Sequence, residues 1–514
     1  MYSKLFSASV FGIDAFIVEI ETHLDNSLPG FAIVGLPDAT IRESRERISA
    51  AIKNSDFIFP TKKITVNLAP ADVAKVGSGF DLPIALSILS AIGFIEKEAF
   101  ENTITLGELS LEGGLRPIHG TLSIALKAKE KGYTRLLVPK QNADEGALVD
   151  DLEVIPVETL RQAVEYINGL QIIPPSKVDI DALFNKNLYQ SNIDLSDVKG
   201  QENVKRAIEI SAAGGHNILL IGPPGSGKTM LAKRIPTVLP PLTLSESLET
   251  TKIHSIAGLL DKNQALITER PFRSPHHTIS DAALVGGGMS FIKPGEISIA
   301  HHGVLFLDEL PEFARNVLEV LRQPLEDKKI CVSRAKLSVE YPANFMLACS
   351  MNPCPCGNYG DQMKECSCTP TQIQRYLGKI SGPLLDRIDI HVEVPAVKYK
   401  DLSENRTGET SKVIRNRVIN ARKVQTERYK NTSENVFKNA DMATKELDNY
   451  CQLDEQSKNL IQKAMQRMGL SARAYDRILK VSRTIADLNN SENIKVEHIS
   501  EAIQYRSLDR EYWK

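Results

Sequence analysis

The feature that most restricts the fold of this chain is a glycine-rich segment at residues 222–229, which reads GPPGSGKT. It fits the pattern G-x-x-x-x-G-K-[ST], which holds phosphates where a strand precedes it and a helix follows it. Residues 218–221 are apolar, as in a buried strand, and residues 230–234 can continue as a helix. Further apolar strands are expected at 304–307 and 344–350. The segment therefore predicts an α/β domain with a parallel sheet and right-handed crossovers.

The same segment predicts a nucleotide site. Its glycines let backbone N–H groups wrap around phosphates, and the N-terminus of the following helix adds positive potential. Lys228 would reach the β- and γ-phosphates, and the Thr229 hydroxyl would ligate Mg²⁺. The alternative is a glycine-rich turn that binds nothing, which the flanking strand and helix disfavour. The residues expected to contact ATP are Gly222, Pro223, Pro224, Gly225, Ser226, Gly227, Lys228, Thr229 and Met230.

Polar residues follow the two other expected strands. Asp308 and Glu309 come directly after residues 304–307. Asp308 would hold Mg²⁺ through water, and Glu309 would act as general base on the attacking water. Asn352 follows the strand at 344–350 and could sense the γ-phosphate, although an Asn before a proline is also typical of a turn.

Arg387 and Arg473 are the remaining candidates for the ATP site. An arginine at a subunit edge can neutralise transition-state charge on the ATP of a neighbouring subunit. A surface ion pair with Asp386 or Asp476 would explain the same arginines. The residue pattern alone leaves both roles open.

Four regions are expected along the chain. Residues 1–168 mix alternating strands with apolar helical runs, which predicts an α+β domain. Residues 169–195 contain a proline pair typical of a linker, residues 196–395 form the α/β core, and residues 396–514 form an all-α lid. No apolar run approaches the roughly 18 residues that span a membrane. Seven scattered cysteines without an export signal predict a reducing, cytoplasmic location. The net charge of -2 excludes only a globally basic nucleic-acid binder, so any contact with DNA must be local.

Long segments of the chain resemble the ComM/YifB family of magnesium-chelatase-like AAA+ proteins. The resemblance implies a homo-hexameric ring with ATP between subunits, with Arg387 as the trans-acting arginine finger and Arg473 as the second sensor arginine. It also implies an ATP-driven DNA motor, a helicase that drives branch migration in homologous recombination and natural transformation alongside recombination proteins. The segments that carry the resemblance are FAIVGLPDATIRESRERISAAI (31–52), NLAPADVAKVGSGFDLPIAL (67–86), RPFRSPHHTISDAALVGGG (270–288), HHGVLFLDELPEF (301–313) and LRQPLEDKKICVSRA (321–335).

A basic β-hairpin is expected between the second and third core strands. Six copies projecting into a ring would follow single-stranded or branched DNA by its phosphates, without reading the bases. Lysines on a solvated hairpin that discourage edge pairing are the alternative. The expected DNA-binding residues are Lys328, Lys329, Arg334 and Lys336.

Residues 104–139 and the string KVGSGFDLPIAL resemble the Lon proteolytic domain. Lon-type peptidases use a serine whose hydroxyl is deprotonated by a lysine on a following helix, and the two must be within hydrogen-bond reach. In this chain Gly79 rather than Ser78 stands in register, and Ile124 occupies the lysine position, with Lys127 about one helical turn away. The sequence predicts a catalytically silent domain, although an alignment shifted by one residue would restore Ser78.

Two C-x-C pairs lie nine residues apart, directly after Asn352. Four thiolates on one loop can bind zinc tetrahedrally, although this spacing is tighter than usual, and four reduced cysteines are the alternative. The pairs His276-His277 and His301-His302 are poor chelates, since adjacent strand residues face opposite ways, so a structural or interfacial role is expected. The candidate zinc ligands are Cys354, Cys356, Cys366 and Cys368.

Two other functions remain open at this point. A chelatase- or MoxR-like remodeller of a protein partner would have the same ATP site, and an ATP-dependent protease would need the missing lysine. Stimulation of ATP hydrolysis by DNA would separate the first of these from the DNA motor.

Overall fold

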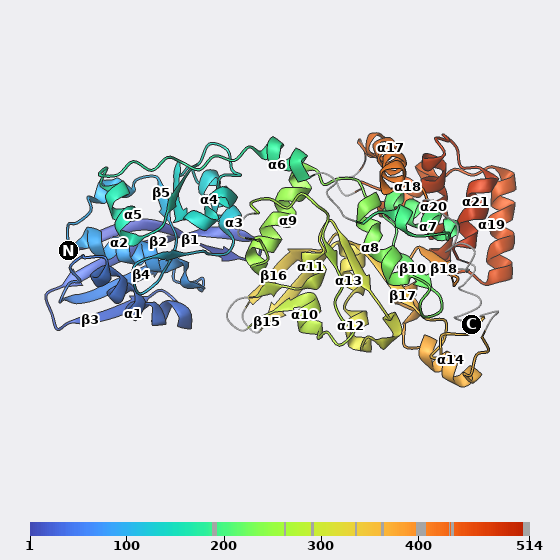
Figure 1. Ribbon diagram of the computed structural model, residues 1–514, viewed down its shortest axis with the longest axis horizontal. Coiled ribbons are helices and arrows are strands. Elements are labelled where there is room, and N and C mark those ends of the chain that lie inside the picture. Colours follow the sequence, from blue (N-terminus) through green and yellow to red (C-terminus); the bar gives the residue numbers. More distant parts are fainter. Residues whose placement is uncertain are drawn as a thin grey trace.

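The computed structural model contains two large β-sheets, three two-stranded sheets and a helical C-terminal part, with the two large sheets and the helical part arranged along the longest axis (Figure 1). The predicted multidomain α/β organisation, with a parallel sheet and a helical C-terminal region, is confirmed. None of the described helices combines the length and the apolar character that crossing a membrane requires. The described residues are 1–187, 193–261, 264–288, 292–334, 337–360, 364–396, 408–430, 432 and 436–506.

The N-terminal sheet is mixed and has seven strands in the order β3-β4-β2-β1-β5-β8-β9. Strands β1 and β2 form a long antiparallel hairpin in which alternate residues are buried, as the period of a half-buried sheet requires. Helix α2 is buried along its whole length and packs against both of these strands. The elements are β1 (Tyr2–Phe11), β2 (Asp14–Asp25), β3 (Gly30–Val34), α1 (Ala39–Asn54), β4 (Lys63–Ala69), α2 (Asp81–Ala91), β5 (Thr103–Thr105), β6 (Glu108–Leu109), β7 (Leu115–Arg116), α3 (Thr121–Glu130), β8 (Arg135–Pro139), α4 (Lys140–Gly146), β9 (Glu153–Val157) and α5 (Leu160–Ile167).

The second sheet has five strands in the order β11-β14-β17-β10-β18, and every neighbouring pair is parallel. Both faces are covered, so β10 and β14 are apolar along their length rather than alternating. One face packs on α7, α8 and the C-terminal helices, and the other packs on the helices that follow β11 and β14. The elements are α7 (Glu202–Gly214), β10 (Ile218–Ile221), α8 (Lys228–Val238), α9 (Leu244–Ala257), β11 (Phe272–Arg273), α10 (Asp281–Val285), β12 (Gly286–Gly287), β13 (Lys293–Pro294), α11 (Glu296–Ile299), β14 (Val304–Leu307), α12 (Arg315–Glu319), α13 (Arg322–Asp327), β15 (Lys329–Arg334), β16 (Leu337–Pro342), β17 (Met346–Met351), α14 (Pro370–Leu377), α15 (Gly382–Leu385) and β18 (Ile390–Glu393).

Two predicted elements differ in detail from the structure. The strand expected from residue 344 begins at Met346, because the backbone of Asn344 is bonded outside the sheet: its carbonyl accepts from His302 N at 2.7 Å and its N–H donates to His301 Nδ1 at 3.0 Å. The expected linker 169–195 contains a helix, α6 (Ile180–Asn187).

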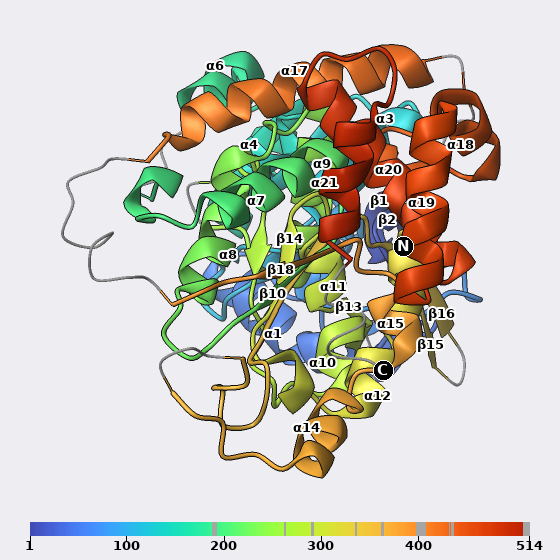
Figure 2. The same cartoon turned by 90° about the vertical axis from the view of Figure 1, so that its right-hand side faces the viewer.

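Helices alone follow β18 in the described part of the chain, as the sequence predicts. Figure 2 shows them stacked above the edge of the five-stranded sheet, with α14 on the opposite side. They are α17 (Ser411–Tyr429), α18 (Thr444–Tyr450), α19 (Glu455–Met468), α20 (Ala472–Leu488) and α21 (Val496–Gln504).

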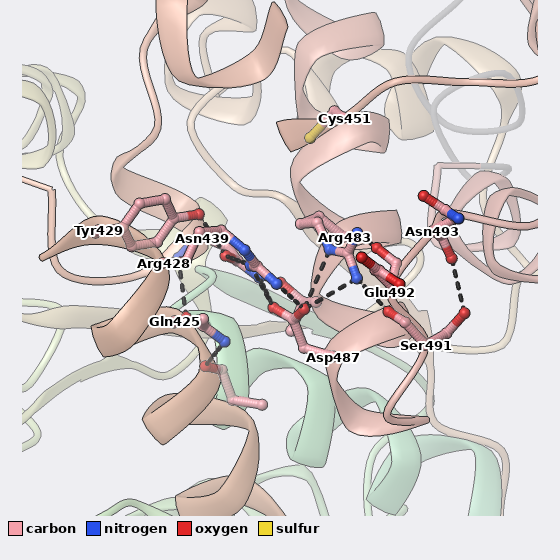
Figure 3. Close-up of polar contacts among 12 residues, drawn as sticks. Gln425, Arg428, Tyr429, Asn439, Cys451, Arg483, Asp487, Ser491, Glu492 and Asn493 are labelled. Atoms are coloured by element: carbon pink, nitrogen blue, oxygen red, sulfur yellow. Dashed lines mark hydrogen bonds and ion pairs between the residues drawn. The ribbon is translucent and has the colours of Figure 1, made fainter. Parts of the chain in front are cut away.

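A polar network holds these helices together around Asp487, whose side chain is buried (Figure 3). Arg428 from α17 forms a two-point ion pair with its carboxylate, and Arg483 from the preceding turn of α20 donates to it at 3.1 Å. Asn439 donates to it at 2.8 Å. The Arg483 guanidinium also donates to the carbonyls of Ser491 and Glu492 at 2.6 and 2.7 Å, so its donors are used within the fold. These arginines therefore stabilise the helical region.

Candidate active site

The loop after β10 has the conformation that a phosphate cradle requires. Gly225 and Gly227 have φ values of +79° and +88°, in the left-handed region that favours glycine. At Gly222 a Cβ would lie 2.1 Å from the carbonyl oxygen of Val394, so no side chain fits there. Helix α8 begins at Lys228, directly after the loop, and its first N–H groups face the loop without intrahelical partners. This geometry suits an anion at the helix N-terminus.

The Lys228 ammonium is surrounded by acceptors. Its Nζ donates to the carbonyls of Gly222 at 2.7 Å and Pro223 at 2.9 Å, and to Asn352 Oδ1 at 3.1 Å. Three acceptors match the three N–H groups of an ammonium. Burial lowers the pKa of Lys228 from its usual value. The contact with Asn352 joins the phosphate loop to the end of β17, which lies next to β10 in the sheet.

The carboxylate of Asp308 lies at the end of β14 and faces the start of α8. Thr229 Oγ1 donates to Asp308 Oδ2 at 2.7 Å, and Ser350 Oγ donates to the other carboxylate oxygen. The next residue, Glu309, has a φ of +54° and an exposed side chain. His277 Nδ1 lies 3.6 Å from Glu309 Oε2. The three strand ends thus bring a lysine, a hydroxyl and two carboxylates together at one edge of the sheet.

Ser350 and His277 were not predicted as site residues. Ser350 stands within a run of buried apolar residues, and only its place just before the predicted polar strand end distinguishes it. His277 belongs to the HH pair that the sequence assigned to a structural role, and no local pattern links it to Glu309.

Three family descriptions match nearly the whole chain. Magnesium chelatase, subunit ChlI, matches residues 194–402, subunit ChlI of Mg-chelatase matches 20–142, and the ChlI C-terminal family matches 408–506. Competence protein ComM of Haemophilus influenzae is 43% identical over 507 residues, which cover 98% of this chain and 97% of that protein. The chain belongs to the ComM/YifB family of magnesium-chelatase-like AAA+ proteins. YifB of Escherichia coli, an uncharacterized protein, is 42% identical over 99% of this chain and 97% of its own length.

A weaker similarity joins the N-terminal region of this ComM/YifB-family chain to Lon proteases. Lon protease 2 of Bacillus subtilis is 30% identical over 157 residues, which cover 28% of this chain and 27% of that protein. Lon protease of Metamycoplasma arthritidis is 25% identical over 174 residues.

The structure gives Ser78 and Lys127 separate partners. Ser78 Oγ donates to Glu108, and Lys127 Nζ donates to Glu130 at 2.8 Å. Around Gly79 the surroundings are apolar: a Cβ there would meet Ile118 Cγ2 at 3.6 Å and Leu106 Cδ2 at 3.9 Å. Ile124, at the expected lysine position, is buried in the same apolar cluster as Leu106.

Arg387 and Arg473, to which the ComM/YifB resemblance assigns roles at the ATP site, are engaged elsewhere in this subunit. The nearly buried Arg387 guanidinium pairs with Glu326 and donates to the carbonyl of Pro383 at 2.5 Å. It lines a cavity of about 450 Å³ beside α13. Arg473 is exposed and lies 3.6 Å from Asp386. Both arginines therefore have acidic partners within the chain, and their roles toward a neighbouring subunit stay predictions.

The segment after Arg387 joins the core to helix α20. Asp389 Oδ1 lies 3.0 Å from Arg477 Nη1 of that helix, and Asp389 Oδ2 lies 2.9 Å from His216 Nδ1. The other ring nitrogen of His216 lies 2.8 Å from Thr484 Oγ1, two helical turns beyond Arg477. Burial lowers the pKa of His216, and its two ring nitrogens bridge Asp389, just before β18, and Thr484 of α20.

The four cysteines after Asn352 come together. The Sγ atoms of Cys354 and Cys356 are 3.3 Å apart, and Cys366 Sγ lies 3.6 Å from each of them. With Cys368 included, all four sulfur atoms lie within 4.8 Å of one another, which suits a tetrahedral thiolate site for zinc.

The other grouped ligands, Glu249 with His301 and His302, suit a metal less well. His301 Nδ1 accepts the N–H of Asn344, so its proton is on Nε2, which faces Glu249 at 3.3 Å. His302 Nε2 lies 2.9 Å from the same carboxylate. A protonated Nε2 on His301 has no lone pair for a metal, so this tautomer fits a hydrogen bond to the Glu249 carboxylate better than a metal ligand.

The predicted basic hairpin is present as β15 and β16, paired antiparallel. Its two described lysines are neutralised, however, because Lys328 Nζ lies 2.7 Å from Asp441 and Lys329 Nζ lies 3.0 Å from Glu340. Ion pairs of this kind reduce the positive charge that a phosphate backbone would meet. Of the other two predicted DNA contacts, Arg334 is the last residue of β15 and Lys336 lies outside the described residues.

Proposed function

We propose that this chain is the subunit of a homo-hexameric, ATP-hydrolysing motor that moves on single-stranded or branched DNA. The observation that carries the proposal is the joint contact of Lys228 with Asn352 at 3.1 Å and of Thr229 with Asp308 at 2.7 Å, which gathers phosphate-binding, metal-binding and sensing groups at one sheet edge. A relative with 43% identity is named competence protein ComM, which supports DNA as the substrate of the motor.

In this proposal each group at the site has one task. Lys228 binds the β- and γ-phosphates, and Thr229 and Asp308 hold Mg²⁺, which offsets phosphate charge during transfer. Glu309 accepts a proton from the attacking water, and Asn352 reports the γ-phosphate. Arg387 of one subunit completes the site of its neighbour, and Arg473 senses ATP from the lid.

The proposed domains follow from the same reasoning. Residues 1–168 form a Lon-like domain without peptidase activity, residues 169–195 a linker, residues 196–395 the AAA+ core and residues 396–514 the lid. The lack of peptidase activity is supported by the apolar neighbours of Gly79 and by the burial of Ile124, because a lysine at position 124 would be buried among apolar side chains.

A second candidate function is remodelling of a protein partner. The ion pairs of Lys328 and Lys329 favour it, because a hairpin with neutralised lysines binds phosphates weakly. A DNA motor must break these two ion pairs when the hairpin meets the backbone.

The test compares wild type with Glu309→Gln, using ATP turnover with and without single-stranded and forked DNA. We expect DNA to stimulate turnover, and Glu309→Gln to lower turnover about 100-fold while ATP still binds, since only the base is removed. Glu312→Gln, three residues on and paired with exposed Lys379, is the matched control and should behave as wild type. Normal turnover by Glu309→Gln would refute the catalytic assignment, and a lack of DNA stimulation in wild type would favour the protein remodeller.

We also propose that the four-cysteine cluster binds one zinc ion. Metal analysis of protein that has never met a chelator should find about one zinc per chain, as four thiolates form a closed structural site. Cys356→Ser should lose the metal, whereas Cys331→Ser, an exposed cysteine outside the cluster, should keep it. A zinc content near zero in wild type would remove this proposal.

A further inference from the structure

The turn between β1 and β2 lies against the β15–β16 hairpin. At Gly12, in this turn, a Cβ would be 2.8 Å from Val339 Cγ1 and 3.9 Å from the Glu340 carbonyl oxygen. The next residue, Ile13, packs against the apolar cluster that contains Val332 and Val339. Figure 1 shows the ends of β1 and β2 directed at β16. The N-terminal domain thus contacts the hairpin that the motor would use on its substrate.

The hairpin depends on such contacts for its position. It has two strands only, and a two-stranded hairpin is at best marginally stable in water. Its buried side chains, among them Val332, Val339 and Tyr341, pack on the core cluster that Ile13 joins. Tyr341 also donates from its hydroxyl to the Ile292 carbonyl at 2.5 Å. Removal of the Ile13 contact would therefore loosen one side of the hairpin and leave the other attached.

Helix α3 holds the turn from behind. Ser123, in its first turn, donates from Oγ to the carbonyl of Ile13 at 2.7 Å. Gly120, which precedes the helix, leaves no room for a side chain, because a Cβ would lie 2.6 Å from Val10 Cγ2 and 3.4 Å from Ile256 Cγ1. The start of α3 is thus wedged between β1 and helix α9 of the ATPase region.

A buried carboxylate fixes α3 to α9. Glu145 Oε1 accepts the backbone N–H of Leu122 at 2.8 Å and the hydroxyl of Ser255 on α9, while the N–H of Gly120 donates to the same hydroxyl oxygen at 2.8 Å. Leu266, beyond α9, is buried in the apolar cluster of the N-terminal domain. The domain is therefore packed onto α9 and joined to it by buried polar contacts.

On its other side, α9 is attached to the nucleotide-binding core. Residues 239–243 connect it to α8, and Arg270 holds this connection by donating to the carbonyls of Pro240 at 2.6 Å and Pro241 at 3.1 Å. Glu249 of α9 lies 2.9 Å from His302 Nε2, just before β14. Helix α8 and strand β14, which both contribute residues to the ATP site, are thus each connected to α9 over a short distance.

We infer that the N-terminal domain is a brace that sets the position of the β15–β16 hairpin relative to α9, through Ser255, the first turn of α3, Ser123 and Ile13. A domain without peptidase activity then has a positioning role in the motor. The inference rests on the proposed function only in the part that concerns DNA; the contact itself can be tested without DNA.

The test measures hydrogen exchange of the hairpin amides, residues 329–334 and 337–341, in Ile13→Ala and in Ser123→Ala. Because local opening sets the exchange rate, we expect exchange about ten-fold faster than in wild type. Two matched controls lie away from the hairpin. Ile58→Ala removes an exposed apolar side chain of the N-terminal domain, and Ser176→Ala removes a serine hydroxyl of the linker that donates to Asp144. Their hairpin exchange should equal wild type. Basal ATP turnover should stay unchanged in all four variants, because none of these residues contacts the phosphate loop.

The same variants are then assayed for DNA-stimulated turnover, where Ile13→Ala should lose most of the stimulation, about five-fold, and Ile58→Ala none. Wild-type hairpin exchange in both Ile13→Ala and Ser123→Ala would overturn the brace. If exchange rises in these variants while DNA fails to stimulate even wild type, the brace stands and the DNA motor fails. If exchange rises and stimulation stays at the wild-type level, the hairpin contact has no role in the motor and the inference is wrong.

Discussion

The two sheets of this protein carry their polar loop residues in different ways. In the five-stranded sheet, three parallel strands end at one edge, and residues that follow them form a connected set in which Thr229 meets Asp308 and Lys228 meets Asn352. In the seven-stranded sheet, the loop with Ser78 has a polar neighbour in Glu108, but the adjoining position of Gly79 faces apolar side chains.

The difference shows that the ATP site and a Ser–Lys dyad place different demands on the surrounding fold. Parallel strands place their carboxyl ends side by side whatever the loops contain, so polar residues just after such strands converge by topology. A serine on a loop and a lysine on the following helix come together only if the lysine occupies the helix position that faces the serine. In this chain the helix position that would face the loop is Ile124, which is buried.

The largest effect is expected on ATP turnover, when a polar side chain is removed from each of the two loops in turn. Lys228→Ala should lower ATP turnover by at least about 100-fold, because one preorganised charged donor to the phosphates is lost. Ser78→Ala should leave ATP turnover within about two-fold of wild type, since it is outside the ATP site. Turnover of ATP and cleavage of casein are measured for both variants.

Lys233→Ala is the control for the first variant, because Lys233 is exposed on the same helix. Turnover close to wild type in Lys228→Ala would break the comparison on the ATP side. Casein cleavage that depends on ATP and disappears in Ser78→Ala would break it on the other side, by making the N-terminal domain a working peptidase.

Much of the ATP site could be predicted from local sequence. The strand expected at 304–307 is β14 (Val304–Leu307). A glycine-rich loop with this spacing between a strand and a helix predicts one conformation, the phosphate-binding loop. Asp308 could be placed near Thr229 because the carboxyl ends of parallel strands lie at one edge of a sheet. The motif residues and the parallel strands indicate the same site, so the ATP site could be predicted without knowing which distant side chains are in contact.

What could not be predicted depends on partners far away in sequence. Lys328 was expected to be free for DNA, but Asp441, from the helical region, pairs with it. His277 reaches Glu309, and Ile13 reaches the apolar cluster that contains Val339, only after the whole chain has folded. No periodicity or motif encodes such contacts, because they depend on how separate elements dock rather than on how each one forms.

A smaller effect is expected from an attempt to restore the lysine of a dyad. Ile124→Lys should destabilise the N-terminal domain by at least about 2 kcal/mol, because an ammonium would be buried among apolar side chains without a partner. Ile124→Met, which nearly conserves volume, should cost less than about 1.5 kcal/mol. Urea unfolding, monitored by hydrogen exchange of the amides in β5 and β8, measures the free energy of unfolding of both variants. Wild-type stability of Ile124→Lys would mean that the position is accessible to water and that the two regions differ less than the structure indicates.

The smallest effect is expected in the cysteine loop that follows Asn352. This loop lies against the phosphate loop, unlike the Ser78 loop of the N-terminal domain. Gly357 and Gly360 have nearly the same φ, +82° and +78°, so replacing either with alanine costs about 1 kcal/mol of backbone strain. They differ in their surroundings. A Cβ at Gly357 would lie 2.4 Å from Pro224 Cδ in the phosphate loop, whereas a Cβ at Gly360 would meet nothing within 4 Å.

Gly357→Ala should therefore raise the KM for ATP about five-fold, the equivalent of about 1 kcal/mol of overpacking against the phosphate loop, and Gly360→Ala should change it by less than about two-fold. Steady-state ATP turnover measures both, with zinc content checked to make sure that the cluster is intact. Equal KM values in the two variants would mean that the cysteine loop moves away from Pro224 at no cost. The loop would then be an appendage of the sheet, as the Ser78 loop is, rather than part of the phosphate cradle.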